Sequence, residues 1–487
     1  MTLGQLFSGI TEIPEELTER VVTGVTSDNR EVEPGFLFVC VKGRSFDGHN
    51  VAAAMLEKGA CAVVTERPLG LRAEICVEES RRMYPELLSA FYDRPTQELR
   101  LGAVTGTNGK TTTVNLCAQI TRALGHQTGV IGTVGCDTGK GLEYSHDGPP
   151  TTPEPRKLYQ LFREMADIGT EYCFLEASSM ALAQHRFAAE SFVVGAFTNL
   201  TQDHLDYHGT MEDYYLAKRM LADMSRTMVI NIDDEYGRRT VDYCRTSGIQ
   251  AVTTSVTAND GADYYAEFIK LHPHGAEFLL TCPEKQKSWV AKIPLTGLYN
   301  VSNAVQAAVM CHMLGFPMED VLAALEKSPG VSGRLETIYQ GEFTVIRDYA
   351  HTGDGLEKLL STLRPLTDRL TAVFGAAGER DAGKRPDMGR IAARYADRLI
   401  ITTDNPRHEP QQQTIDDVRR GVPADKDCEE FIDRRTAIYR ALETAQPGEL
   451  IALCGKGHED YQAIGDENVP FNEREIVLDW LKSRGII

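Results

Sequence analysis

The sequence predicts an α/β protein with three domains, and three observations lead to that prediction. Short apolar runs alternate with helical patterns along most of the chain, which is typical of mostly parallel sheets covered by helices. A glycine-rich loop joins a strand to a helix near residue 106, and 487 residues are too many for one hydrophobic core. We expect a small N-terminal α/β domain over 1–97, a central P-loop-type domain over 98–331 and a C-terminal Rossmann-like α/β domain over 332–487.

The first domain has the pattern of a small α/β unit. The apolar runs at 36–41 and 61–66 predict two buried strands, and the segment 51–60 between them predicts a helix. A second helix is expected over 80–92. It should end before the sequence Asp93–Pro95, because the residue that precedes a proline disfavours helix, and this point predicts a linker.

The central domain begins with the segment Leu101–Thr113, LGAVTGTNGKTTT, in which a strand, a tight loop and a helix start follow one another. The two glycines let backbone N–H groups approach an anion, and the dipole of the following helix favours negative charge there. Lys110 can reach the outer phosphates of a nucleotide, and the hydroxyl of Thr111 or Thr112 can hold magnesium. A plain glycine turn is the alternative, but GK followed by three threonines favours a nucleoside triphosphate site.

The rest of the central domain alternates strands with helices, which predicts a mostly parallel sheet. Its strands are expected at 127–134, 171–178, 193–200 and 228–233. Residues 264–294 change to a pattern of antiparallel hairpins, with turns at 272–275 and 283–287. A helix is then expected to start at 300–303 and to end near Gly315.

Polar residues collect at the predicted carboxyl ends of these strands, where parallel sheets bind their ligands. Glu176 and Ser178 follow one strand, and a group of Asp, His and Tyr residues at 203–209 follows the next. Together with Glu176, this group offers oxygen and imidazole ligands to a divalent cation. The same residues are equally suited to capping and packing a loop, and both interpretations stay open.

Lys218 lies in a helix that is expected to begin after the N-cap Thr210, with Asp213 in its first turn, and to run to about Ser225. The apolar residues on the same helix face are Met211, Tyr214, Tyr215, Leu221 and Ala222. A lysine in such a stripe is desolvated, which favours a neutral amine that can act as a nucleophile or be carbamylated into an anionic metal ligand. The helical pattern alone favours the other interpretation, a lysine whose ammonium extends to the rim of the stripe.

The C-terminal domain repeats the alternation of strands and helices. Its strands are expected at 343–350, 370–378, 397–406 and 450–457. The loop DNPR, Asp404–Arg407, follows the third of these strands; Pro406 stiffens the loop and Arg407 offers a planar fork to a carboxylate. The loops GKRP at 383–386 and GKGHE at 455–459 should lie on the same sheet edge. Each loop alone is compatible with solvated surface charge, but the three together predict a pocket.

The overall composition excludes several classes of function. A net charge of −19 argues against nucleic acid or an anionic membrane surface as the partner. No apolar run approaches the length of a membrane span, and the N-terminus lacks the pattern of a signal peptide. The 11 cysteines are scattered without a CxxC pair, which predicts reduced thiols in a cytoplasmic protein.

A series of motifs extends over nearly the whole chain: TGTNGKTTT, TTPEP, EASS, FTNLTQDHLDYHG, YLAKRML, NVSNA, GRLE, DYAHT, GERDAGKRPDMG, DNPR and GKGHEDYQ. In this order they resemble the Mur ligase family, and most of all its members that add 2,6-diaminopimelate to UDP-N-acetylmuramoyl-L-alanyl-D-glutamate in peptidoglycan synthesis. The resemblance implies a monomeric cytoplasmic enzyme that uses ATP and Mg²⁺. It also implies that the glutamate side-chain carboxylate becomes an acyl phosphate, which the amine of the incoming amino acid then attacks.

The resemblance implies residue roles as well, with Lys110, Glu176, His204 and Lys218 as the catalytic set. The ATP phosphates would contact Gly106, Thr107, Asn108, Gly109, Lys110, Thr111 and Thr112. Magnesium would be held by Thr111, Glu176, His204 and the carbamate of Lys218. The rest of the nucleotide would contact Asn300, Asn303, Arg334, Asp348 and His351. The UDP-linked precursor would contact Ser27, Asn29, Thr151, Thr152, Ser178, Gln184 and Arg186. The amino acid would contact Arg385, Asp404, Asn405, Pro406, Arg407, Gly455 and Glu459.

The choice of amino acid has a physical argument. Diaminopimelate carries a second carboxylate where lysine has only a hydrogen, and Arg407 offers that carboxylate a bidentate partner. Lysine is the alternative substrate. It would leave the Arg407 guanidinium unpaired and close to the ammonium of the lysine side chain. A paralogue that binds ATP or the precursor without ligating is an alternative from another class. The presence of Lys110, Lys218, Glu176 and His204 argues against it, because such a protein has no physical need for all four.

Overall fold

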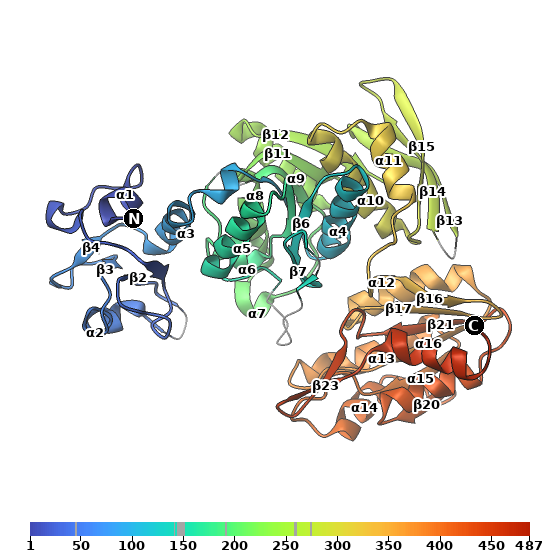
Figure 1. The fold of residues 1–487 in the computed structure, drawn as a ribbon. Helices are drawn as coiled ribbons and strands as arrows, with labels where there is room; N and C mark the ends of the chain where they lie inside the picture. Colours follow the sequence, from blue (N-terminus) through green and yellow to red (C-terminus); the bar gives the residue numbers. More distant parts are fainter. Residues whose placement is uncertain (44–45, 141, 144–150, 190–191, 258–260, 273–274) are drawn as a thin grey trace. The chain divides into compact units, whose positions relative to one another are not determined.

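The computed structural model describes residues 1–43, 46–140, 142–143, 151–189, 192–257, 261–272 and 275–487, and Figure 1 shows its ribbon. The chain divides into two compact units. The first comprises 1–266, 280–289 and 302–325, and the second comprises 267–279, 290–301 and 326–487. Three main sheets with helices between their strands confirm the predicted α/β class. The boundaries proposed at 97/98 and 331/332 stay predictions.

The N-terminal sheet is fully parallel, in the order β1-β2-β3-β4. Its strands are β1 (Gly24–Thr26), β2 (Phe36–Val39), β3 (Ala62–Thr65) and β4 (Glu74–Cys76). The helices are α1 (Leu3–Phe7), α2 (Ala52–Glu57) and α3 (Ser80–Phe91), with 3₁₀ turns η1 (Glu15–Leu17), η2 (Gly48–Val51) and η3 (Pro95–Gln97). The strands predicted at 36–41 and 61–66 and the helices at 51–60 and 80–92 are confirmed with slightly shorter bounds.

The central sheet has the order β15-β14-β13-β12-β11-β10-β5-β9-β6-β7-β8. Pairing is parallel from β12 through to β6, and β6-β7-β8 are antiparallel. The strands up to β9 are β5 (Arg100–Thr105), β6 (Thr128–Gly132), β7 (Gly135–Asp137), β8 (Leu142–Glu143) and β9 (Tyr172–Glu176). The next three are β10 (Phe192–Phe197), β11 (Ser225–Asn231) and β12 (Gln250–Ser255). The carboxyl ends of β5, β9 and β10 therefore meet at one edge, as predicted for the polar residues that follow them.

The predicted hairpin section is confirmed as β13 (Tyr264–His272), β14 (Gly275–Cys282) and β15 (Lys287–Ile293). The turn predicted at 283–287 joins β14 to β15, whereas the turn predicted at 272–275 includes residues 273–274, which lie outside the described residues. The central helices are α4 (Lys110–Ala123), α5 (Pro155–Asp167), α6 (Ser179–Ala183), α7 (Leu205–His208), α8 (Met211–Asp223), α9 (Glu235–Ser247), α10 (Leu298–Met313) and α11 (Met318–Glu326). Helix α10 begins at Leu298, two residues before the predicted start, and α8 ends two residues before the predicted Ser225.

The C-terminal sheet has the order β16-β17-β21-β18-β19-β20, and all pairs except the antiparallel β16-β17 are parallel. Its strands are β16 (Glu336–Gln340), β17 (Thr344–Asp348), β18 (Leu370–Phe374), β19 (Arg398–Thr402), β20 (Asp427–Phe431) and β21 (Leu450–Cys454). A separate hairpin consists of β22 (Tyr461–Ile464) and β23 (Glu467–Pro470). The helices are α12 (Gly353–Leu363), α13 (Arg385–Tyr395), α14 (Gln411–Arg419), α15 (Arg434–Glu443) and α16 (Glu473–Ser483), with 3₁₀ turns η4 (Arg364–Leu366) and η5 (Ala382–Lys384).

Helices cover both faces of the C-terminal sheet, and successive strand residues show it. Leu399 and Ile401 of β19 pack in a cluster with α12, α13 and α14, whereas Ile400 packs in a second cluster with α15 and α16. Both faces are therefore apolar, as expected for a parallel sheet buried on two sides. This doubly wound arrangement confirms the Rossmann-like class predicted for the third domain.

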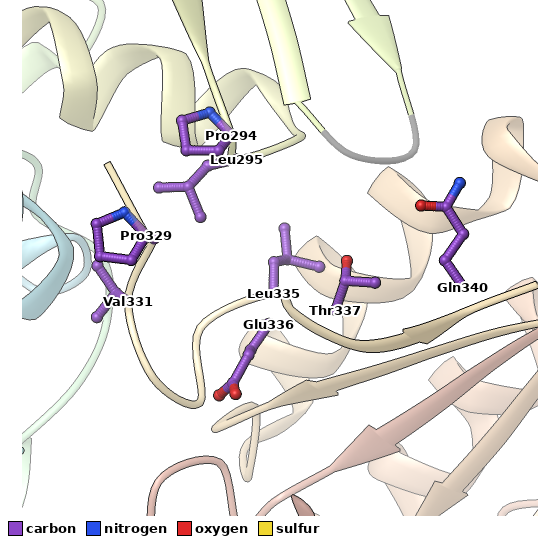
Figure 2. Close-up of a pocket in the computed structure, with 9 residues that line it drawn as sticks. Pro294, Leu295, Pro329, Val331, Leu335, Glu336, Thr337 and Gln340 are labelled. Carbon is purple, nitrogen blue, oxygen red and sulfur yellow. The ribbon is translucent and has the colours of Figure 1, made fainter. Parts of the chain in front are cut away.

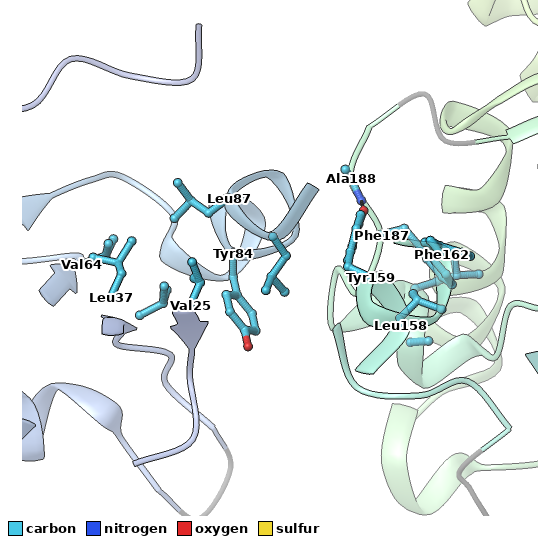
Figure 3. Close-up of a cluster of buried hydrophobic side chains, with 14 of the residues drawn as sticks. Val25, Leu37, Val64, Tyr84, Leu87, Leu158, Tyr159, Phe162, Phe187 and Ala188 are labelled. Carbon is cyan, nitrogen blue, oxygen red and sulfur yellow. Dashed lines mark hydrogen bonds between the residues drawn. The ribbon is translucent and has the colours of Figure 1, made fainter. Parts of the chain in front are cut away.

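The first unit contains an extensive hydrophobic cluster. Figure 3 shows residues of the N-terminal sheet and α3, among them Val25, Leu37 and Tyr84, and residues of α5 such as Tyr159. The Tyr159 hydroxyl accepts a hydrogen bond from the backbone N–H of Ala188 at 2.8 Å, so the ring is buried with its polar end satisfied. Among the described residues, no helix is long and apolar enough to cross a membrane.

Candidate functional site

The glycine-rich loop between β5 and α4 has the conformation that the sequence predicts. Gly106 and Gly109 have φ of +146° and +88°, a region that residues with a side chain rarely adopt. A Cβ on Gly106 would lie 1.8 Å from Thr198 Oγ1, and one on Gly109 would lie 2.3 Å from Asn303 Oδ1. Thr198 follows β10, and Asn303 lies in α10. Only glycine fits at either position, because a side chain there would meet Thr198 or Asn303 as well as an unfavourable φ.

The end of β10 fixes this loop through Asn199. The Asn199 backbone carbonyl accepts from Thr107 N–H at 2.9 Å, and its side-chain Oδ1 accepts from Asn108 N–H at 3.0 Å. Thr198 Oγ1 donates to the Asn108 carbonyl at 2.6 Å. These hydrogen bonds fix the shape of the loop, and a fixed shape lowers the entropic cost of binding an anion.

Two lysines converge on one backbone carbonyl of the loop. Lys110 Nζ donates to Gly106 O at 2.9 Å, and Lys218 Nζ donates to the same oxygen at 2.7 Å. Lys218 extends from α8, which packs against the sheet edge where β5 ends. Helix α8 begins as predicted, because Thr210 Oγ1 accepts from Asp213 N–H. The local sequence thus brings the amines of two lysines to the same carbonyl of the loop.

Lys218 is 1% exposed, so the interpretation as a lysine that extends to the rim is wrong. The apolar stripe is covered, and the amine lies 4.6 Å from the centre of the Tyr214 ring. Burial holds the pKa of Lys218 well below its usual range, and the charge of Lys110 lowers the pKa further. The chemistry predicted for a neutral amine is therefore available at this position.

Glu176, at the end of β9, is a buried carboxylate held by the end of the neighbouring strand β6. Its Oε1 accepts from the Thr133 backbone N–H at 2.8 Å, and its Oε2 accepts from Thr133 Oγ1 at 3.2 Å. Thr133 directly follows β6, whereas the sequence pattern placed it inside the strand expected at 127–134 and did not indicate this contact. Thr133 Oγ1 also lies 3.1 Å from Thr151 Oγ1, which connects Glu176 to the segment predicted to bind the precursor.

The predicted precursor-binding residues of the central domain form one hydrogen-bonded network. Thr152 Oγ1 lies 2.6 Å from the Glu176 carbonyl and 3.1 Å from Ser178 Oγ. Arg186 donates to the Thr152 carbonyl at 2.5 Å and to Gln184 Oε1 at 2.7 Å. Burial lowers the pKa of the Arg186 guanidinium. The structure therefore brings Thr151, Thr152, Ser178, Gln184 and Arg186 together beside Glu176.

His204 precedes α7 with a φ of +51°, and its Nε2 lies 3.5 Å from Asp203 Oδ2. Its ring is about half exposed, 6.2 Å from the ring of Tyr214 on α8. Among the described residues, no three His, Cys, Asp or Glu side chains are grouped closely enough to hold a metal ion by themselves. The described side chains of 203–209 and Glu176 therefore form no such group, and hydroxyl, carbamate or phosphate oxygens would have to complete a cation site there.

Among the residues predicted to contact the rest of the nucleotide, Asn303 lies beside Gly109 in the first unit, as its approach to that glycine shows. Asn300 belongs to the second unit and is buried, and its Nδ2 donates to the Thr296 carbonyl at 2.9 Å. The predicted uridine-binding residues Ser27 and Asn29 lie in the loop after β1. Ser27 N–H donates to the Tyr84 hydroxyl at 3.3 Å, and the Asn29 carbonyl accepts from Lys58 Nζ at 3.1 Å.

In the second unit, Tyr349 brings the remaining nucleotide-contact residues together. The Arg334 guanidinium lies 4.6 Å from the centre of its ring, and the His351 ring lies 4.6 Å away. Asp348, the residue before it, accepts from the backbone N–H groups of Leu335 and Ala350, both at 2.8 Å. Burial raises the pKa of the Asp348 carboxyl. Sequence reasoning missed Tyr349, although it stands inside the motif DYAHT.

The loop DNPR meets the loop GKGHE, as predicted from their positions on one sheet edge. Asn405 Nδ2 donates to Glu459 Oε2 at 2.9 Å, and Gly455 has a φ of +114° beside Asp404. The residue that connects them was missed: Lys456 is fully buried and donates to both Asn405 Oδ1 and Glu459 Oε2. Its signal was its place between two glycines directly after a strand, where a lysine is unexpected unless it has partners.

The two arginines predicted to contact the amino acid differ in their surroundings. Arg407 has a φ of +53°, is partly exposed, and donates from Nη1 to Gly378 O at 3.3 Å. Arg385 is buried, and its Nη1 lies 2.7 Å from Glu409 Oε2 and 2.9 Å from Asp417 Oδ2. Arg385 thus already has two carboxylate partners, whereas Arg407 presents more of its guanidinium to a ligand.

Two cavities are separate from these residues. One of about 200 Å³ in the second unit is lined by Pro294, Leu295, Pro329–Val331, Leu335–Thr337 and Gln340, and Figure 2 shows it beside the segment that leads into β16. The other, of about 520 Å³, lies near Arg100 and Tyr172, at the amino ends of β5 and β9. Neither is lined by a predicted site residue.

Comparisons with known proteins agree with this arrangement. Three family profiles match: "Mur ligase family, catalytic domain" over residues 21–92, "Mur ligase middle domain" over 104–311 and "Mur ligase, glutamate ligase domain" over 333–457. The UDP-N-acetylmuramoyl-L-alanyl-D-glutamate–2,6-diaminopimelate ligase of Geobacillus kaustophilus (strain HTA426) is 41% identical over 477 residues, which cover 95% of this chain and 96% of that protein.

The protein of the same name from Listeria monocytogenes serotype 4b (strain F2365) is 38% identical over 97% of each chain. A solved structure described as a UDP-N-acetylmuramoyl-L-alanyl-D-glutamate–2,6-diaminopimelate ligase aligns over 100% of both chains, with a TM-score of 0.75 and 32% identity. Similarity at this level over nearly the full length of the chain places it in the Mur ligase family.

Proposed function

We propose that this chain is the ATP-dependent ligase that adds meso-2,6-diaminopimelate to UDP-N-acetylmuramoyl-L-alanyl-D-glutamate in peptidoglycan precursor synthesis. The observation that carries the proposal is similarity along the full length to relatives of that printed name, at 41% and 38% identity. The preformed glycine loop with two converging lysines supports it, because such a loop suits a transferring phosphoryl group.

The chemistry has two transfers. The side-chain carboxylate of the precursor's glutamate attacks the γ-phosphate of ATP, the bond to ADP breaks, and an acyl phosphate forms. The free amine of the amino acid then attacks the acyl carbon, and phosphate leaves from the tetrahedral intermediate. Backbone N–H groups at the start of α4, over residues 110–112, and the ammonium of Lys110 stabilise negative charge on the phosphoryl oxygens. The dipeptide carboxylate is held in line with that phosphate by the residues beside Glu176, which are Thr151, Thr152, Ser178, Gln184 and Arg186.

The residues near the loop suit Mg²⁺ by their donor chemistry. Glu176 is a buried carboxylate, and the Thr111 hydroxyl stands at the start of α4, so hard oxygen ligands are present. His204 and a carbamate on Lys218 would complete the set, and bound Mg²⁺ would neutralise charge on the phosphates. Carbamylation requires a neutral amine, which the lowered pKa of Lys218 provides. With ¹³C-labelled bicarbonate, the protein should show a carbamate carbon signal that a Lys218→Met variant lacks.

The proposed binding role of each part of the chain follows the predicted domain boundaries. Residues 1–97 bind the uridine end of the precursor through Ser27 and Asn29, residues 98–331 bind ATP, and residues 332–487 bind the amino acid. The Arg407 guanidinium pairs with the second carboxylate of diaminopimelate. Because both nucleotide substrates are made inside the cell, the enzyme works in the cytoplasm, and we propose that it does so as a monomer.

The test is phosphate release by the purified chain with ATP, Mg²⁺ and the UDP-linked dipeptide, run in parallel with diaminopimelate, lysine and ornithine. We expect release that depends on diaminopimelate and exceeds that with lysine by orders of magnitude. Release with lysine alone would support the lysine-adding alternative. Absence of amino-acid-dependent release would refute the ligase and favour the binding paralogue.

A further inference from the structure

Lys456 is a buried cation that the proposed chemistry does not use. It follows β21, its side chain is 0% exposed, and its Nζ lies 2.7 Å from Glu459 Oε2 and 2.8 Å from Asn405 Oδ1. A third oxygen, Asp404 Oδ1, lies 3.8 Å away. Burial of an ammonium is costly unless hydrogen bonds and opposite charge compensate for it. Lys456 has both, and its partners belong to the loops DNPR and GKGHE of the predicted amino-acid pocket. Asp404, Asn405, Lys456 and Glu459 together form what we call the box.

The lysine determines which way the Asn405 amide faces. An ammonium only donates, so the atom that it contacts must be the amide oxygen, and the Ala463 backbone N–H also donates to that oxygen at 2.9 Å. The amide nitrogen consequently faces Glu459 and donates to its Oε2. Without Lys456, one of the two donors that select this orientation is lost.

The lysine also determines the charge of the box. Burial alone would raise the pKa of the Glu459 carboxyl, but the Lys456 ammonium and the Asn405 amide hold it below its usual range, so the carboxylate is ionised. Asp404 is buried as well, and among the described residues its Oδ1 has no hydrogen-bond partner. Removal of the Lys456 ammonium would therefore make the surroundings of these carboxyl groups more negative by one unit charge.

We infer that Lys456 is a positioning residue for the amino-acid pocket, which holds the Asn405 amide and the Glu459 carboxylate in one arrangement and limits the negative charge there. The inference rests on the proposed function, in which these residues receive the incoming amino acid. A more negative box repels the second carboxylate of diaminopimelate, whereas it does not repel the side chain of lysine. Lys456 thereby contributes to the preference for diaminopimelate although it does not itself contact the substrate.

The test compares Lys456→Met with Lys482→Met, a matched change at an exposed lysine of α16 in the same unit. Loss of hydrogen bonds from a charged group predicts a KM for diaminopimelate raised about ten- to one-hundredfold in Lys456→Met. The KM for ATP should change by less than about twofold, and the ratio of kcat/KM for diaminopimelate to that for lysine should fall. Lys482→Met should change neither quantity.

A double-mutant cycle with Glu459→Gln separates positioning from general destabilisation. If Lys456 acts through Glu459, the double variant should be little worse than Glu459→Gln alone. If Lys456→Met does not fold, Lys456→Arg gives the same test, because a planar fork cannot reproduce the contacts of a point-like ammonium.

An unchanged KM for diaminopimelate in a folded variant would overturn the inference. So would equal increases in the two KM values, which would indicate a structural role. A wild-type protein without amino-acid-dependent phosphate release would instead refute the proposed function, so the two failures are distinguishable.

Discussion

Replacement of Lys218 by methionine should separate stability from activity. Methionine keeps the length of the side chain and removes the amine. The hydrogen bond to Gly106 O at 2.7 Å is lost, and a bond from a neutral donor contributes about 0.5–1.5 kcal/mol. The carbonyl keeps Lys110 as a donor, so it is not left unsatisfied. The variant also removes the cost of burying an amine beside a second lysine, and we expect the free energy of unfolding to change by about 1 kcal/mol or less.

The lowered pKa of Lys218 also makes the free energy of unfolding depend on pH. The folded pKa of Lys218 lies below its unfolded value of 10.5, so between the two pKa values the unfolded chain binds more protons. Wild-type stability therefore rises with pH in that window, by up to about 1.4 kcal/mol per unit, and is lost as pH falls toward the folded pKa. Lys218→Met should lack this contribution to the slope.

The assays are urea unfolding at several pH values and phosphate release under the conditions of the ligase test. We expect kcat to fall by about 100-fold or more, because the residue lies where charge develops during phosphoryl transfer. Lys157→Met, at an exposed lysine of α5, should alter neither measurement. Unchanged turnover in Lys218→Met, or a loss of stability above about 3 kcal/mol that accounts for the lost turnover, would refute the reasoning.

Three further substitutions test other parts of the site. Gly106→Ala should raise the KM for ATP at least about tenfold, since its Cβ would lie 1.8 Å from Thr198 Oγ1; Gly125→Ala, also at positive φ but in open space, should leave ATP kinetics unchanged. Arg407→Ala should raise the KM for diaminopimelate about 100-fold and leave that for ATP unchanged, and an equal rise in both would contradict its role. Arg434 of α15 is fully buried and pairs at 2.8 Å with Glu473 of α16, which is also fully buried. Arg434→Met should lower the unfolding free energy by about 3–5 kcal/mol in urea titrations, because it leaves the Glu473 carboxylate unpaired; exposed Arg435→Met should have little effect.

Sequence reasoning succeeded where local chemistry determines structure. The loop before Lys110 and the N-cap of α8 were predicted correctly, because glycine at positive φ and a threonine cap depend only on neighbouring residues. It missed β1 and β4, which have three residues each and are too short to show a periodic pattern. The start of α10 was misplaced by two residues, as is common for helix ends.

Burial and pairing of charged residues could not be predicted. A helical pattern assigns Lys218 to an apolar face, but only the tertiary structure shows that its amine is covered and bonded to Gly106. Arg385 pairs with Glu409, 24 residues away, and Lys456 bonds to Asn405, 51 residues away, as well as to the nearby Glu459. Their contacts depend on the packing of the whole domain, which no local sequence pattern specifies.

The most direct test of the central claim follows an oxygen atom through one turnover. The precursor is prepared with ¹⁸O in the side-chain carboxylate of its glutamate and is incubated with the purified chain, ATP and diaminopimelate. If that carboxylate takes the phosphoryl group from ATP, one ¹⁸O per turnover must appear in the released phosphate, and mass spectrometry should detect it. Phosphate without the label, alongside formation of the amide product, would contradict an acyl-phosphate route.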